Sequence, residues 1–280
     1  MAVAESLSAL VERMPDADGR GMFTENIDKP RIEDALAEIY GGGREYVRGL
    51  VEMLGVPGSE ADVKPRYALH ALGNHILQQG DEPARRGYAE TLAEALAEER
   101  PAHVKAFLCE ELQWFGRGEA AGALAAVLAE EALVEAATMA LMAIGDGAAA
   151  AFREALPAAE GKRRRNLVHG LAALADAESA PLLREVLNDE DREVRLAAGW
   201  GLAQLGDAAA VPLLLEAADA GPGWERIQAD KHCLVLAEKL AAAGRRDEAR
   251  TVYARLAETR TGNAEVYVRE AAERGLASLG

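Results

Sequence analysis

The chain has 280 residues, of which 50% are apolar but only 5% aromatic, and its formal net charge is −16. A surface with this charge repels phosphate backbones and anionic membranes, so neither a nucleic acid nor a membrane is expected as a partner. Alanine and leucine must then supply most of the core, which favours closely packed helices. Cys109 and Cys233 both fall in apolar helical patterns and are expected to be buried thiols, because two cysteines in so long a chain make no disulfide framework.

Residues 1–30 are expected to form an N-terminal helix, residues 3–14, and an arm that lies on the first repeat. The arm is rich in Pro and Gly, which break helical periodicity. Glu5 and Glu12 stand where a signal peptide needs basic residues, and no apolar run approaches the length of a membrane span. Taking Met1 as the natural start, we expect a cytoplasmic protein.

Residues 32–40 and 45–54 are predicted to be two short helices joined by three glycines, residues 41–43. These glycines lack the spacing of a phosphate-binding loop, so a hairpin turn is the simpler interpretation. The next helix, residues 63–79, is followed by Gly80 and Asp81, which can stop one helix and cap the next. Further helical pairs are predicted at residues 101–115 with 119–128, 132–144 with 148–156, and 163–174 with 179–187.

The pattern is clearest in residues 191–219, where Val194, Ala198, Leu202 and Leu205 form one face of an amphipathic helix. Gly206 and Asp207 then repeat the stop and the cap. The same signature occurs at residues 171–176, 141–146 and 112–117, in steps of about 30 residues, although Arg117 replaces the capping residue in the last of these. A repeat of this length made of two helices cannot bury its apolar face alone, so it must stack on its neighbours.

After Asp219 the register changes at Gly221, Pro222 and Gly223, and residues 221–280 are expected to form a longer helical pair and a final helix that continue the same solenoid. The final helix either caps the array or is the point at which a longer natural protein was cut. The stretch from Ala237 to Glu258 is similar to the second half of a tetratricopeptide motif.

Residues 193–215, EVRLAAGWGLAQLGDAAAVPLLL, resemble a HEAT-like repeat of the short type found in bacterial phycobilisome-lyase-like proteins. The resemblance rests on the pairs Val194–Arg195 and Ala197–Ala198, on Leu205–Gly206–Asp207, and on Pro212–Leu213. It implies an all-α, right-handed α-solenoid of stacked antiparallel helical hairpins over residues 31–220. In such repeats the arginine equivalent to Arg195 commonly pairs with an inter-repeat carboxylate, here Asp207 or Asp176; an exposed arginine of little energetic value is the alternative.

Catalytic and metal-binding patterns are scarce. His70 and His75 are five residues apart and do not share a helix face, and no histidine is followed by the glutamate that the di-iron hydroxylases built from similar repeats use. Nothing marks the bilin site of the lyase-like proteins. We therefore expect no catalytic residue, no metal and no cofactor.

The function expected is a non-catalytic protein-interaction scaffold of the armadillo-like kind, which binds a partner protein, or another domain of a longer parent chain, on a concave face built by the second helices. The alternative is a nucleic-acid-processing enzyme such as the HEAT-like DNA glycosylases, which hold DNA in a basic, aromatic groove; the net charge disfavours it. Neither the partner nor the oligomeric state can be predicted from the sequence.

Six residues are candidates for partner contact. Trp200 lies beside Gly199 and Gly201, off the Leu202 face, where a helix–helix seam is favoured over a surface anchor. The basic run near the start of a helix is unfavourable for the helix dipole and could contact an acidic loop or a phosphorylated group. The candidates are Trp114, Arg163, Arg164, Arg165, Trp200 and Trp224.

Overall fold

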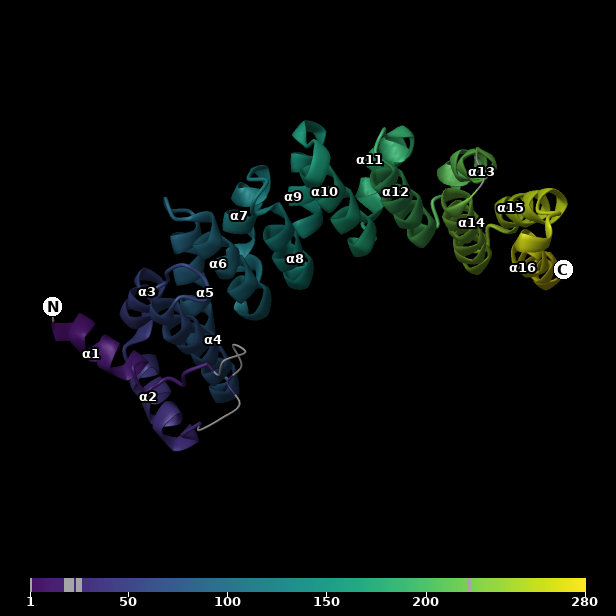
Figure 1. The fold of residues 1–280 in the computed structure, drawn as a ribbon. Helices are drawn as coiled ribbons and strands as arrows, with labels where there is room; N and C mark the ends of the chain where they lie inside the picture. The colour runs from purple at the N-terminus through teal and green to yellow at the C-terminus, as the bar shows by residue number, and fades with distance from the viewer. Residues whose placement is uncertain (1, 18–22, 24–26, 221–222) are drawn as a thin grey trace. The chain divides into compact units, whose positions relative to one another are not determined.

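The structure, a computed structural model, describes residues 2–17, 23, 27–220 and 223–280, and over these residues it contains helices and no strands. The helices form two compact units, residues 1–148 and 149–280 (Figure 1). This division falls inside residues 31–220, for which one continuous array is expected from the sequence. Within each unit, consecutive helices form antiparallel hairpins, so the predicted all-α solenoid class is confirmed.

Unit 1 begins with α1 (Ala2–Val11), which packs on the first hairpin. Its later helices alternate between the first and second positions of a hairpin. The first helices are α2 (Lys29–Gly41), α4 (Glu60–Gln79), α6 (Ala102–Phe115) and α8 (Val134–Ile144). The second helices are α3 (Gly43–Glu52), α5 (Glu82–Leu96) and α7 (Gly118–Ala126), the last extended by a 3₁₀ turn, Val127–Ala129. Second helices pack on one another, α3 on α5 and α5 on α7, and among the first helices α2 packs on α4 and α6 on α8.

Unit 2 follows the same plan. Its first helices are α10 (Gly161–Leu174), α12 (Arg192–Leu205), α14 (Trp224–Ala242) and α16 (Val266–Leu279). Its second helices are α9 (Ala148–Ala155), α11 (Ala180–Glu185), α13 (Val211–Asp219) and α15 (Arg246–Thr259), with 3₁₀ turns at Leu156–Ala158, Ala177–Ser179, Val186–Asn188, Ala208–Ala210 and Asn263–Glu265. The first helices stack in order, α10 on α12, α12 on α14 and α14 on α16 (Figure 1).

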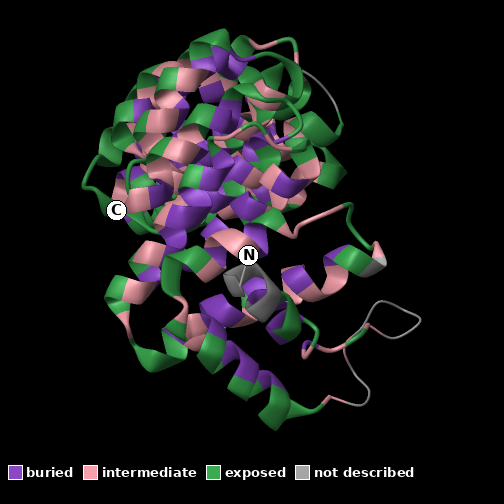
Figure 2. Cartoon of the chain, turned by 90° about the vertical axis from the view of Figure 1, so that its left-hand side faces the viewer, coloured by how far each residue is buried: buried purple, intermediate pink, exposed green. Residues whose placement is uncertain are grey.

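Burial follows the repeat pattern. Val194, Ala198 and Leu202 of α12 are fully buried, as their spacing predicts, and buried residues line the helix faces that meet neighbouring helices (Figure 2). The small residues allow helices to approach closely: a Cβ placed on Gly201 would lie 2.9 Å from the Cα of Ala172 on α10. Both cysteines are buried free thiols, and burial raises the pKa of each to about 12.

The predicted stop-and-cap signals are confirmed at Gly80–Asp81 and at Gly206–Asp207, whereas the side chain of Asp176 makes no capping hydrogen bond. Gly80 and Gly206 end their helices with φ of 66°, a left-handed conformation that glycine adopts without steric cost. Asp81 accepts a hydrogen bond from the backbone N–H of Ala84 over 2.9 Å, and Asp207 accepts one from Ala209 over 3.3 Å. Each hairpin therefore closes within a few residues, which fixes the stacking of the next helix.

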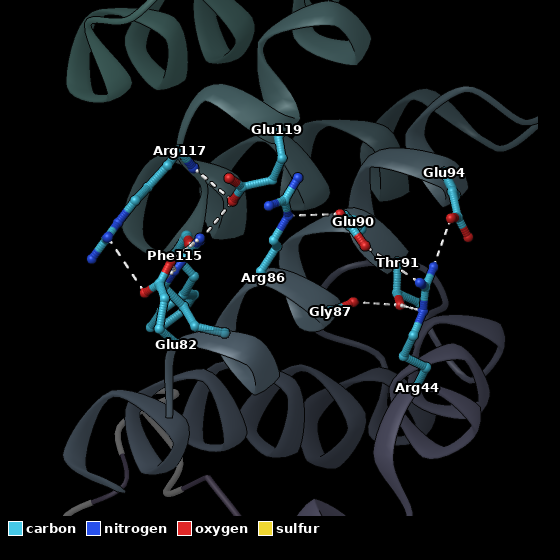
Figure 3. A network of polar contacts seen from close by, with 11 residues as sticks. Arg44, Glu82, Arg86, Gly87, Glu90, Thr91, Glu94, Phe115, Arg117 and Glu119 are labelled. Carbon is cyan, nitrogen blue, oxygen red and sulfur yellow. Dashed lines mark hydrogen bonds and ion pairs between the residues drawn. The ribbon is translucent and has the colours of Figure 1, made fainter. Parts of the chain in front are cut away.

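The exposed edge of α5 carries a polar network that holds the second helices of unit 1 together (Figure 3). Arg44 of α3 reaches across to α5, where it contacts Glu94 over 2.6 Å, Glu90 over 3.4 Å and the hydroxyl of Thr91 over 3.2 Å. On the other side of α5, the nearly buried guanidinium of Arg85 donates to the carbonyl of Phe115 and the carboxylate of Glu119, both over 2.6 Å.

The expected N-terminal helix is present, and its end is tied to the first repeats. Arg13 contacts Glu38 of α2 over 3.0 Å, and Glu12 contacts Lys64 of α4 over 2.9 Å. Half of the expected arm, residues 18–22 and 24–26, lies outside the described residues.

Candidate functional site

A groove on unit 2 brings together three of the six residues that the sequence singles out. It has a volume of about 370 Å³ and runs across the first helices α10, α12 and α14. The residues that line it are Arg165, Asn166, His169, Glu193, Leu196, Ala197, Trp200, Trp224, Gln228 and His232. The second helices, which were expected to build the concave surface, contribute none of these residues. The aromatics and histidines of the first helices, on which affinity was expected to rest, line the groove instead. The reason is size: α11, for example, spans only Ala180–Glu185, whereas the larger aromatic side chains lie on the first helices.

Trp200 lies both at a helix seam and on the groove. Its helix is drawn close to α10 at Gly201, which places the indole beside the neighbouring first helix. The indole stacks on the imidazole of His169, with ring centroids 6.1 Å apart and an interplanar angle of 28°. Because the ring is half-buried and still lines the groove, one of its faces is held by α10 while the remainder stays available to a partner.

Trp224 is the first residue of α14, and its side chain is 51% exposed. The guanidinium of Arg192 lies over the indole at 5.3 Å from the ring centroid, a distance suited to a cation–π contact. Arg192 also pairs with Glu193 over 3.0 Å, so its charge is balanced by its neighbour. A large aromatic surface thus stays in contact with water at the groove entrance.

His232 of α14 lines the groove and also a second, smaller cavity of about 190 Å³. Its ring fits only because residue 199 is glycine: a Cβ at Gly199 would lie 2.9 Å from Nδ1 of His232. Burial, aided by the nearby charge of Lys231, lowers the pKa of His232 to about 4. The imidazole is therefore neutral at physiological pH.

The basic cluster of α10 is largely neutralised by the next repeat. Arg164 contacts Asp189 over 2.5 Å, and Arg165 pairs with Asp191, an interaction that raises the pKa of Arg165. Arg163 donates to the carbonyl of Ala158 over 3.4 Å. Of the three arginines only Arg165 lines the groove. The expected contact with an acidic loop or a phosphorylated group remains a prediction, and these ion pairs weaken it.

The prediction that Arg195 pairs with Asp207 or Asp176 is wrong. Its guanidinium pairs with Glu225 over 2.9 Å and donates to the carbonyl of Asp189 over 2.7 Å. Asp207 and Asp176 are instead paired with arginines of the preceding second helices: Arg184 with Asp207 and Arg153 with Asp176. The second helix ends beside the loop of the next repeat, so an arginine there reaches the loop aspartate more directly than one at the start of a first helix.

Trp114 belongs to unit 1 and does not line this groove. Its side chain is 68% exposed, the most exposed large apolar side chain among the described residues, and its ring meets His70 edge-on with centroids 6.5 Å apart. It remains a candidate for a separate contact.

Sequence reasoning missed His169, Gln228 and His232 as groove residues. A signal existed for His169, since it lies 31 positions before Trp200, one repeat length, and so occupies the equivalent place on the preceding first helix. The described residues include no group of three or more His, Cys, Asp or Glu side chains that could hold a metal ion. Among the same residues, no helix combines the length and apolar character needed to span a membrane.

Comparison with known proteins agrees with this architecture. The family of HEAT repeats matches residues 149–234, from α9 into α14. For these residues the resemblance to HEAT-like repeats that the sequence predicts is confirmed. The search of curated proteins gives no match.

Similar solved structures share little sequence with the chain. One concerns a phosphorylation switch that controls the interaction between cadherin and β-catenin, with 14% identity and a TM-score of 0.46; it covers 97% of this chain, which spans 60% of that one. Human deoxyhypusine hydroxylase has 18% identity and a TM-score of 0.33; the similarity covers 100% of this chain and 97% of the hydroxylase chain. The complex of CpcE and CpcF of phycocyanin lyase from Nostoc sp. has 17% identity and a TM-score of 0.34; the similarity covers 98% of this chain and 94% of the matched chain. At these scores the similarities define no activity or partner.

Proposed function

We propose that the chain is a non-catalytic scaffold that binds a partner protein, or another domain of a longer parent chain, at the groove on α10, α12 and α14. The observation that carries this proposal is the convergence of two solvent-contacting indoles, Trp200 and Trp224, on one groove. Tryptophan is the residue type most enriched at the energetic centres of protein interfaces, because it buries a large, rigid surface at little entropic cost.

The polar side chains of the groove are compatible with this use. Asn166 of α10 and Gln228 of α14 line it with amide side chains, and the neutral His232 adds no buried charge. A partner can therefore bury the indoles without leaving an uncompensated ion behind, which would otherwise cost several kcal/mol.

A nucleic-acid function finds less support here. The groove contains one arginine of the basic cluster, Arg165, and that arginine is already paired with Asp191. A formal net charge of −16 opposes the approach of a phosphate backbone. The DNA-glycosylase alternative predicts association with duplex DNA at low salt, and we expect none at micromolar protein.

The test is an affinity purification from the source cells with three forms of the full chain. Wild type is compared with a Trp200→Ala, Trp224→Ala double variant and with Tyr267→Ala, a control residue on α16 that is 46% exposed and lies outside the groove. We expect at least one protein to co-purify with wild type and the control and to be depleted about 30-fold or more with the double variant, the loss typical of an interface hot spot. The same set of proteins recovered with all three forms would refute the assignment, provided that far-UV circular dichroism shows all three to be folded.

A further inference from the structure

Unit 1 contains a larger cavity that the scaffold function does not use. It has a volume of about 1120 Å³ and lies between α2 and α4. Ile32 and Leu36, one turn apart on α2, and Val63, Tyr67 and Ala71 of α4 give it apolar walls. Pockets for small organic ligands have volumes of about 300–1,000 Å³ and combine such walls with a few convergent polar groups, so this cavity is large enough for one.

The polar groups lie along one edge of α4. Arg66, His70, Asn74 and Gln78 follow one another at intervals of four residues, so they form a single row on the helix. The row is about 18 Å long at the helical rise of 1.5 Å per residue. A ligand aligned with it would be elongated, with one side against the polar row and the other against the apolar wall of α2.

Arg66 is held rigidly at one end of the row. It pairs with Asp62, whose fully buried carboxylate also accepts a hydrogen bond from the backbone N–H of Gly55 over 2.7 Å. The guanidinium lies over the ring of Phe107 at 4.3 Å from its centroid. Its Nη2 is buried and has no hydrogen-bond partner within the described part of the chain. Asp62 is also among the residues that line the cavity, but its carboxylate is fully buried while the Arg66 side chain is 20% exposed, so a ligand meets the cation rather than the acid.

His70, one turn further along α4, is oriented from behind by a buried acid. Its Nδ1 lies 2.9 Å from a carboxylate oxygen of Glu111, whose side chain is 3% exposed and which also contacts the hydroxyl of Tyr88 over 3.1 Å. A proton on Nδ1 is therefore donated to Glu111, which leaves Nε2 as the ring nitrogen for a ligand. The hydrogen bond to Glu111 also raises the pKa of His70 and so favours the protonated form, in which Nε2 is a donor.

We propose that this cavity is a binding site for an amphiphilic carboxylate, whose head contacts Arg66 and His70 and whose apolar body lies between α2 and α4. Arg66 and His70 are four residues apart on α4, so their side chains are neighbours on one face of the helix and one carboxylate group can contact both. In a protein of net charge −16, the basic side chains of Lys29, Arg66 and His70 line this cavity. Glu33 is the exposed acid among its described lining residues, whereas the carboxylates of Asp62 and Glu111 are buried. The site is distinct from the partner groove, which lies on unit 2.

Decanoate is the probe, because its chain length suits the row and its charge suits the donors. Titration calorimetry of the full chain with decanoate, kept below its micelle concentration, should give saturable binding of one molecule per chain. Decyltrimethylammonium, which has the same apolar chain and the opposite charge, should bind at least tenfold more weakly. Equal binding of the two amphiphiles, or uptake of several decanoate molecules without saturation, would overturn the proposal.

Two kinds of variant locate the site. His70→Gln should weaken decanoate binding about tenfold while it leaves the apolar walls intact. Arg66→Met is less informative, since it strands Asp62 and can unfold the unit, so Ala71→Trp is used to fill the cavity and leave every polar contact in place. Ala71→Trp should abolish binding, whereas Ala136→Trp on α8, at the equivalent register but outside the cavity, should bind like wild type. Unchanged binding in folded Ala71→Trp, judged by circular dichroism, would place the ligand elsewhere and refute the assignment.

Discussion

The guanidinium of Arg260 donates to the carboxylate of Asp230 over 2.8 Å, and both side chains are almost wholly excluded from water. Arg260 follows α15 and also contacts Asp219, at the end of α13, over 2.7 Å and the carbonyl of Ala218 over 3.0 Å. One arginine therefore joins three helices of unit 2. Burial raises the pKa of Asp230 above its ordinary value, even though Arg260 is adjacent.

Arg260→Met should lower the free energy of unfolding by about 3 to 5 kcal/mol, because it leaves the buried Asp230 without a counter-charge. The double variant Arg260→Met, Asp230→Leu should recover part of this loss, since it removes both charges. Urea denaturation followed by circular dichroism measures both values. Arg274→Met, which removes a 72% exposed arginine 3.9 Å from Glu270, is the control and should change stability by less than about 0.5 kcal/mol.

Two glycines on helices should respond oppositely to alanine. At Gly201 a Cβ would lie 2.8 Å from the Cβ of Ala172 and 2.9 Å from its Cα, and the backbone of α10 cannot move away cheaply. Gly201→Ala should therefore destabilise the protein by about 1 to 3 kcal/mol. Gly122 of α7 has no atom within 4 Å of its would-be Cβ, so Gly122→Ala should stabilise by about 0.5 to 1 kcal/mol. The urea midpoint of Gly201→Ala should lie below that of wild type and the midpoint of Gly122→Ala above it. Shifts in the same direction would contradict the prediction.

Asp207 both caps the start of a helical segment and pairs with Arg184 of the preceding repeat. Asp207→Ala should cost about 1 to 2 kcal/mol, the value of a lost cap together with a partly buried ion pair. Asp207→Asn keeps the capping oxygen and should cost less. Thermal unfolding compares these variants with Asp247→Ala, whose carboxylate is 96% exposed. Equal costs for Asp207→Ala and Asp247→Ala would contradict the inter-repeat role.

His232 should make unit 2 less stable in mild acid. Its pKa is about 4 in the folded chain and about 6.5 when unfolded, so the unfolded state binds a proton over that interval and the folded state does not. Stability due to the neutral ring is fully present above about pH 6.5 and falls as pH decreases toward 4, by up to about 3 kcal/mol. His232→Leu should flatten this part of the stability profile. A profile that keeps the wild-type slope would show that other groups cause it.

The sequence predicts the hairpins well because their signals are local. Gly206 and Asp207 end one helix and start the next through backbone geometry and a single hydrogen bond, and both effects depend only on adjacent residues. The apolar face of α12 follows equally from its spacing, since Val194 and Leu202 have no other surface to cover.

Interactions between repeats were harder to predict. Arg184 is 23 residues before Asp207 in the sequence, farther than Arg195, and only the packing of α11 against α12 decides that Arg184 reaches it. The sequence does not single out Arg260, because nothing in the neighbouring residues indicates that Asp230 and Asp219 converge on it. The unit 1 cavity depends on the contact of α2 with α4, where the repeat signature is weakest.

The Arg153–Asp176 and Arg184–Asp207 pairs are the same bond, displaced by 31 residues in both members. The ion pair between neighbouring repeats is thus formed by residues at the same positions of each repeat. Excision of residues 162–192 would place Arg153 and Asp207 at the same sequence separation that each now has from its ion-pair partner. Whole repeats can therefore be gained or lost in evolution while the same ion pair connects the neighbours that remain.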